Sequence, residues 1–142
     1  MTTPRSKRYL AVDLGGKRTG LAVGDDLTRI ASPVDVLEIP PGPRLVEAIL
    51  GAIREHGPDA IVVGLPLNMD GTEGDAAKQV RAFGDLLVSA TSLPVEYHDE
   101  RLTSRAAELD LAGLYTRKGK KRRLDAVAAA RILSGYLSRE SG

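Results

Sequence analysis

The segment AIVVG at residues 60–64 constrains the fold of this chain more than any other short stretch of its sequence. A short, continuous apolar run is typical of a strand that is buried on both faces. On either side of it, the apolar residues of 44–56 and 76–87 follow helical spacing. A strand without a polar face, set between two helical segments, predicts an α/β sheet that is covered by helices on both sides.

The remaining elements follow from similar patterns and from their breakers. The strands are expected at residues 9–14, 21–23, 31–39, 60–64 and 95–99, and the helices at 44–56, 76–87, 103–113 and 125–139. We expect Thr72 and Asp75 to cap the second helix. The order β-β-β-α-β-α-β-α-α predicts a mixed five-stranded sheet, with three antiparallel strands followed by parallel ones and helices on both faces.

Composition limits the class of protein. The 142 residues are 42% apolar and 27% charged, which predicts one globular domain over residues 1–142. Residues 1–8 carry charge without a following apolar segment of signal-peptide length, so we expect a flexible basic tail on a cytoplasmic protein with no membrane partner. The absence of Cys excludes disulfides and thiolate metal sites, and His56 and His98 cannot form a zinc site without carboxylates.

An aspartate near the end of the first strand is the first candidate functional residue. In YLAVDLGGKRTG, Asp13 follows an apolar run and precedes a glycine-containing loop. Carboxylates are depleted in strands, and a buried charge is costly unless it is paired or bound to a metal. Asp13 therefore needs a partner, although an aspartate in front of two glycines is also typical of a simple turn.

Two further carboxylates are expected at the same edge of the sheet. Glu100 follows the last strand, and the carboxyl ends of parallel strands share the edge where open α/β sheets place their sites. Asp125 falls within the apolar arc of the last helix, beside Ala129 and Ile132, so we expect it to face the sheet. Simpler interpretations exist: Asp125 as an acid that complements the helix dipole, and Glu100 as a surface partner of Arg101.

Three carboxylates without His or Cys form a hard oxygen ligand set, which suits Mg²⁺ or Mn²⁺. Two such ions about 3.5–4 Å apart can activate a water and stabilise the leaving oxygen in phosphodiester hydrolysis. We therefore predict that Asp13, Glu100 and Asp125 are the catalytic residues and the ligands of a two-metal site.

A strongly basic segment comes immediately before the third carboxylate. RKGKKRR at residues 117–123 has six cations in seven positions, and we expect a mobile loop because Gly119 interrupts it and no apolar periodicity is present. Its cations could hold phosphates, or the run could be only a solvated surface. The candidate nucleic-acid-binding residues are Lys17, Arg18, Arg101, Arg117, Lys118, Lys120, Lys121, Arg122 and Arg123.

Four stretches together resemble a known family. They are AVDLGGKRTGLAVGD, VVGLPLNMDG, DERLTS and LDAVAAARIL, and they span nearly the whole chain. The chain resembles the YqgF family of the ribonuclease H-like superfamily, which also contains the RuvC resolvases. The resemblance implies a ribonuclease H-like fold and a nuclease that matures the 5′ end of pre-16S ribosomal RNA in ribosome biogenesis, or one that resolves Holliday junctions. It matches Asp13 to the first-strand acid, Glu100 to the acid of DERLT and Asp125 to the acid of the last helix.

The match departs from the wider superfamily at one strand. Many members carry an acid at the end of the fourth strand, where this chain has Gly64, Leu65 and Pro66. Glu100 is then the substitute, with neighbouring Asp99 as its rival, and the number of metal ions stays open between one and two.

Two other functions compete with a nuclease. The stretch DLGGKRTG also resembles the phosphate loop of actin-like ATPases and sugar kinases, but those proteins need two such domains around the nucleotide. A non-catalytic RNA- or ribosome-binding module would keep the basic segment and would not depend on Asp13. The sequence leaves open RNA or DNA as the substrate, the cleavage position, and a monomer or a dimer.

Overall fold

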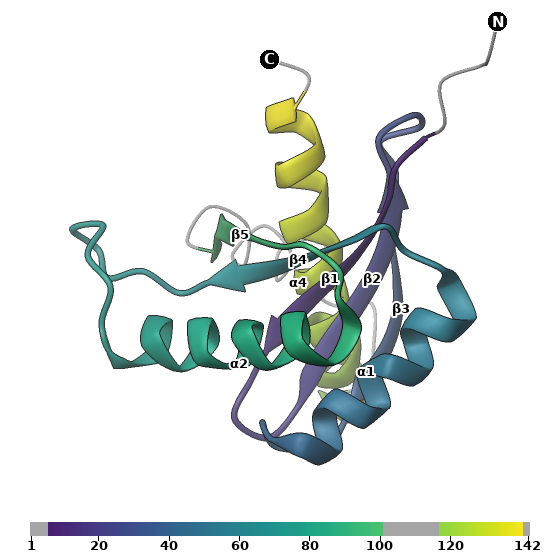
Figure 1. The fold of residues 1–142 in the computed structure, drawn as a ribbon. Helices are drawn as coiled ribbons and strands as arrows, with labels where there is room; N and C mark the ends of the chain where they lie inside the picture. Colours follow the sequence, from purple (N-terminus) through teal and green to yellow (C-terminus); the bar gives the residue numbers. More distant parts are fainter. Residues whose placement is uncertain (1–5, 101–116, 141–142) are drawn as a thin grey trace, which may run out of the picture.

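The computed structural model describes residues 6–100 and 117–140, with side chains described for 6–100 and 125–138. Its centre is a five-stranded sheet in the order β3-β2-β1-β4-β5 (Figure 1). The strands are β1 Arg8–Leu14, β2 Thr19–Asp25, β3 Ala31–Leu37, β4 Ala60–Leu65 and β5 Val95–Asp99. The first three pair antiparallel, and β1, β4 and β5 pair parallel. The predicted topology is confirmed, with β4 of AIVVG buried throughout.

Helices cover both faces of the sheet, as predicted. On one face lie α1, Pro43–His56, and α2, Asp75–Thr91; on the other lies α4, Arg117–Glu140 (Figure 1). Alternate residues of β1 therefore enter two separate cores: Leu10 and Val12 pack toward α1 and α2, whereas Tyr9 and Ala11 pack toward α4. The same alternation directs the next residue of the second set, Asp13, toward α4.

Small residues let α4 approach the sheet closely. The face of α4 that contacts the sheet includes Ala126, Ala129 and Ala130, all buried. A Cβ atom at Gly20 of β2 would overlap the backbone carbonyl of Asp125, so the helix rests directly on the strand at this point. The close approach brings the backbone of Asp125 to the end of β2 where the β1–β2 loop enters.

The basic segment is helical, which makes the expectation of a loop at 117–123 wrong. The helix that was expected from about Asp125 begins at Arg117. Lysine and arginine are good helix formers, and one internal glycine costs only about 1 kcal/mol, which a long, packed helix tolerates. Gly119 therefore interrupts the charge pattern without ending the helix.

Three smaller expectations also need correction. The strand expected to reach residue 39 ends at Leu37. The N-cap of α2 is Gly74 without a side-chain cap, because the Thr72 hydroxyl donates to Asp70 Oδ1 at 2.6 Å instead. Lys7 and Arg8, which were expected in the flexible tail, are held by the sheet: the backbone N–H of Lys7 donates to Asp26 Oδ1, and Arg8 begins β1.

The helix expected at 103–113 and residues 1–5 lie outside the described residues. None of the helices in the described part of the chain combines the length and the apolar composition needed to cross a membrane.

Candidate active site at the carboxyl ends of the central strands

Asp13 lies at the sheet edge where β1 ends, on the face covered by α4. It pairs with Gly20 in the β1–β2 ladder, directly beneath the point where α4 touches β2. Its carboxyl group hydrogen-bonds to Glu100. Two acids that are 87 positions apart in the sequence are thus in contact, as the strand order predicted.

The pKa of Asp13 is strongly raised by its surroundings. Burial is the largest cause, and together with the hydrogen bond to Glu100 and the charges of Glu100 and Asp125 it brings the pKa of Asp13 to about 9. Without a cation, the carboxyl group of Asp13 therefore keeps its proton at neutral pH. A site of this kind favours positive charge, which is the property required of a cation site.

Glu100 follows directly after β5, which ends at Asp99. On the strand itself, Glu96 and His98 face α4, where the Tyr136 hydroxyl donates to Glu96 Oε2 at 2.6 Å and the His98 ring packs against the Tyr136 ring. The groups that raise the pKa of Asp13 include Glu100 and do not include Asp99. This favours Glu100 over Asp99 as the acid that meets Asp13.

The space around Gly64, near the end of β4, is too small for an acidic side chain. A Cβ at Gly64 would lie 2.5 Å from Ile132 Cδ1 and 3.5 Å from the carboxyl carbon of Glu100. The volume that a side chain at position 64 would need is already filled by α4 and by Glu100. Glu100 therefore occupies the space where an acid from β4 would otherwise project.

Asp125 is held by Arg18. Arg18 Nε donates to Asp125 Oδ2 at 2.8 Å, and the two side chains are 29% and 30% exposed. Because α4 begins at Arg117, Asp125 lies in the third turn and is not the first-turn acid of the simpler interpretation. Its charge still acts on Asp13, so all three predicted acids belong to one electrostatic cluster.

The donor set fits a hard divalent cation in its chemistry. The three groups offer carboxylate oxygens only, and a bound cation would offset the burial and the two neighbouring acids that raise the pKa of Asp13. Within residues 6–100 and 125–138, however, no group of three His, Asp or Glu side chains already has the spacing of a metal site. The third carboxylate, Asp125, is instead in contact with the guanidinium of Arg18.

The predicted cations are only partly described. Lys17 is exposed on the β1–β2 loop, beside Arg18. The side chains of residues 117–123 and residue Arg101 lie outside the described residues; the backbone of 117–123 forms the first turns of α4, immediately before Asp125.

Sequence reasoning missed two contacts of α4. The pairing of Arg18 with Asp125 was not predicted, and Arg18 was expected only as a phosphate contact. The contact of His98 was not predicted either: the residue is half-buried, with its ring centroid 6.5 Å from that of Tyr136. The period-2 alternation of 96, 98 and 100 was the available signal for the second contact.

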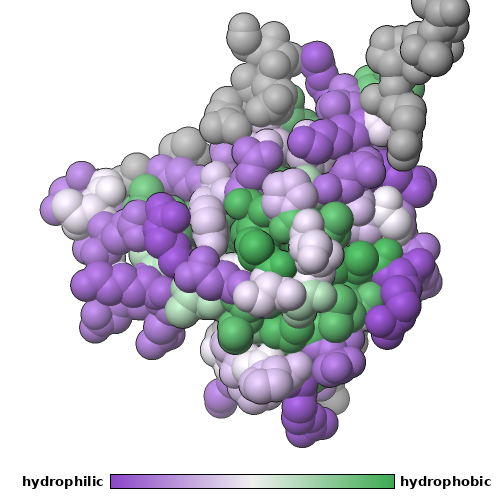
Figure 2. Space-filling view, in the orientation of Figure 1, coloured by the Kyte–Doolittle hydropathy of each residue, from purple (hydrophilic) through white to green (hydrophobic). Residues whose placement is uncertain are grey.

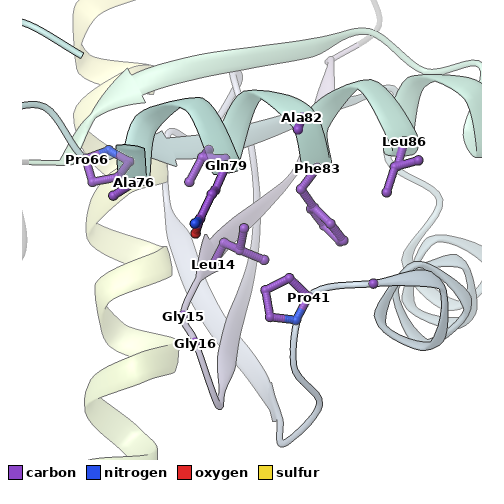
Figure 3. A pocket seen from close by; sticks show the side chains of 12 residues that line it. Leu14, Gly15, Gly16, Pro41, Pro66, Ala76, Gln79, Ala82, Phe83 and Leu86 are labelled. Atoms are coloured by element: carbon purple, nitrogen blue, oxygen red, sulfur yellow. The ribbon is translucent and has the colours of Figure 1, made fainter. Parts of the chain in front are cut away.

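The opposite face of the same edge has an apolar pocket of about 430 Å³ (Figure 3). Leu14, Gly15 and Pro41 line one side, and Phe83 and Leu86 of α2 line the other. Hydrophobic surface occupies the middle of this face of the molecule (Figure 2). No charged residue lines the pocket, so it does not have the chemistry of a cation or phosphate site.

Two bacterial relatives match about nine-tenths of this chain. A "Putative pre-16S rRNA nuclease" of Chloroflexus aurantiacus is 45% identical over 129 residues, which cover 90% of this chain and 84% of the relative. A protein of the same name from Anaeromyxobacter sp. (strain Fw109-5) is 44% identical over 131 residues, which cover 92% and 96% of the two chains.

Solved structures of resolvases share the fold. Thermus thermophilus RuvC in complex with a Holliday junction substrate superposes with a TM-score of 0.58 at 15% identity, over 96% of each chain. The fowlpox virus resolvase bound to Holliday junction DNA has a TM-score of 0.58 at 12% identity, over 95% of this chain and 99% of that one. The ribonuclease H-like fold predicted from the sequence is confirmed by these neighbours.

A family model gives the assignment. The model named RuvX and described as Holliday junction resolvase matches residues 7–139, which include all three acids of the candidate site. Together with relatives above 40% identity, this match confirms the resemblance found in the sequence. The chain belongs to the RuvX family, which is also called YqgF.

Proposed function

We propose that this protein is a metal-dependent nuclease that hydrolyses phosphodiester bonds in the precursor of 16S ribosomal RNA. The observation that carries the proposal is the half-buried Asp13–Glu100 pair at the end of β1, with Asp125 beside it. A surface that only binds RNA has no need of two acids in contact, because RNA is itself negatively charged. Such a pair is suited to hydrolysis with a hard metal ion.

In this proposal Asp13, Glu100 and Asp125 hold one or two Mg²⁺ or Mn²⁺ ions. When bound, such an ion would supply an activated water and stabilise the leaving oxygen. Asp13 must give up its proton for its carboxylate to act as a ligand. Lys17 and the cations of α4 would hold the phosphates on either side, by contacts that are insensitive to sequence.

Ribosomal RNA is preferred as the substrate because the relatives at 44–45% identity carry that name. Branched DNA is the second candidate, favoured by the description of the family model and by the junction-bound neighbours of the same fold. A ribosomal precursor particle would then be the natural partner. A non-catalytic RNA- or ribosome-binding module is disfavoured because it gives the Asp13–Glu100 pair no role.

Cleavage of two labelled substrates tests the proposal. One is a transcript that carries the 5′ leader of 16S RNA, and the other is a four-way DNA junction; each is incubated with Mg²⁺, with Mn²⁺ or with EDTA. We expect metal-dependent cleavage of the transcript by the wild type and none by Asp13→Asn. Asp85→Asn, which changes an exposed carboxylate on α2, is the matched control. Cleavage of the junction alone would favour DNA, and cleavage in EDTA would refute the metal site.

A further inference from the structure

The ion pair between Arg18 and Asp125 joins the β1–β2 loop to α4 within the acidic cluster. Its 2.8 Å contact uses Asp125 Oδ2, and the proposed function makes the same carboxylate group a metal ligand. A divalent ion on either oxygen of Asp125 would be repelled by a guanidinium on that carboxylate, because like charges repel. Arg18 and a divalent ion therefore compete for Asp125.

A divalent ion can displace the guanidinium of Arg18 from Asp125. Both side chains of the pair are nearly one-third exposed, and an ion pair with that much contact with water is weak. A divalent ion held by Asp13, Glu100 and Asp125 together would contact three carboxylates of one electrostatic cluster, whereas the guanidinium contacts Asp125 alone. Asp125 can thus leave Arg18 and bind a divalent ion, because losing the exposed ion pair costs little free energy.

The β1–β2 loop lets the side chain of Arg18 move while the backbone of the loop stays in place. A Cβ at Gly15 would overlap the carbonyl of Arg18, so the loop is folded tightly on itself just before this residue. A guanidinium that leaves Asp125 then stays at the edge of the site, where the scissile phosphate must lie. Arginine binds phosphate through paired N–H groups, which a lysine cannot reproduce.

We propose that Arg18 is a positioning residue that couples cation binding to nucleic-acid binding: it holds Asp125 until that carboxylate takes a divalent cation, and its guanidinium then binds a substrate phosphate. This inference rests on the proposed function. Linkage requires the coupling to be reciprocal, so that divalent cations tighten nucleic-acid binding and nucleic acid tightens cation binding.

The resting contact is tested by NMR of the Arg18 Nε–H group in ¹⁵N-labelled protein, assigned by its loss in Arg18→Lys. In EDTA we expect slow exchange with water, because the group is bonded to Asp125. Titration with Mg²⁺ should release it to fast exchange, and Asp125→Asn should show the released state without any metal. If Mg²⁺ binds while the group stays protected, the proposal is wrong and the nuclease function is untouched.

Calorimetric titration with Mn²⁺ measures the competition. We expect Arg18→Gln to bind Mn²⁺ up to about five-fold more tightly than Lys17→Gln, which removes a charge from the same loop without a contact to Asp125. Equal affinities for the two variants would overturn the proposal. Failure of the wild type to bind Mn²⁺ or Mg²⁺ at all would overturn the metal-dependent function as well.

Junction binding measures the coupling itself. With all three acids intact, saturating Ca²⁺, a hard cation chosen to fill the site while suppressing cleavage, should raise the affinity for a four-way DNA junction relative to EDTA. Adding Arg18→Gln should bring the ratio of the two affinities close to one, whereas Lys17→Gln should weaken binding about equally in both conditions. A ratio that Arg18→Gln leaves unchanged would show that the guanidinium does not carry the coupling.

Discussion

Replacing Asp13 by asparagine should stabilise the metal-free protein at neutral pH. Burial and two neighbouring acids raise the pKa of Asp13 from 3.8 to about 9, so the folded state holds a proton that the unfolded state has lost. An asparagine amide is neutral at every pH and can donate to Glu100 in place of that proton. The substitution thus removes the cost of a buried acid while keeping its size.

The sign and size of the effect follow from linkage. Between about pH 4 and pH 9 the folded state binds more protons at Asp13 than the unfolded state, so this group makes stability fall as pH rises. The slope for one proton is about 1.4 kcal/mol per pH unit, or about 3 kcal/mol between pH 5 and pH 7. For a domain of this size that change corresponds to a difference in Tm of roughly 10 °C.

Urea unfolding of metal-free wild type, Asp13→Asn and Asp85→Asn at pH 5, 6, 7 and 8 measures this slope. The free energy of unfolding of the wild type, relative to Asp13→Asn, should fall steadily with pH, and Asp85→Asn should follow the wild type. Adding Mg²⁺ at pH 8 should stabilise the wild type and leave Asp13→Asn unchanged, because a cation replaces the proton of Asp13. Parallel pH profiles for wild type and Asp13→Asn would refute the raised pKa of Asp13.

Other predictions concern α4 and the remaining acids. Gly20→Ala should lower the free energy of unfolding by about 1–3 kcal/mol by pushing α4 off β2, while Gly16→Ala, with open space around it, should not; denaturant unfolding compares them. Tyr136→Phe removes the hydrogen bond to β5 and should cost about 1–2 kcal/mol by the same assay, and no loss would mean the bond is replaced by water. Glu100→Gln and Asp125→Asn should abolish most cleavage and spare nucleic-acid binding; a wild-type cleavage rate would remove that residue from the site.

The fold was predictable because it depends on patterns that repeat along each element. The continuous apolar run of β4, the three strand patterns before α1 and the strand–helix alternation after it leave few topologies open. Strand order then placed Asp13 beside Glu100 without any knowledge of side-chain packing. The start of α4 was not predictable in the same way, because a run of cations has good helix propensity and no apolar face, and those two signals disagree.

The site was predictable only as far as its backbone positions. Which residue Asp125 contacts depends on how closely α4 approaches β2, and that distance is set by Gly20 and by the alanines of the helix. The close approach brings Asp125 to the mouth of the β1–β2 loop, where Arg18 can reach it. A helix held farther out by larger residues would separate Asp125 from both Arg18 and Asp13. Gly20 and the alanines of α4 therefore both close the core and bring the acids together. Substitutions that enlarge these residues should weaken cation binding even where the protein still folds.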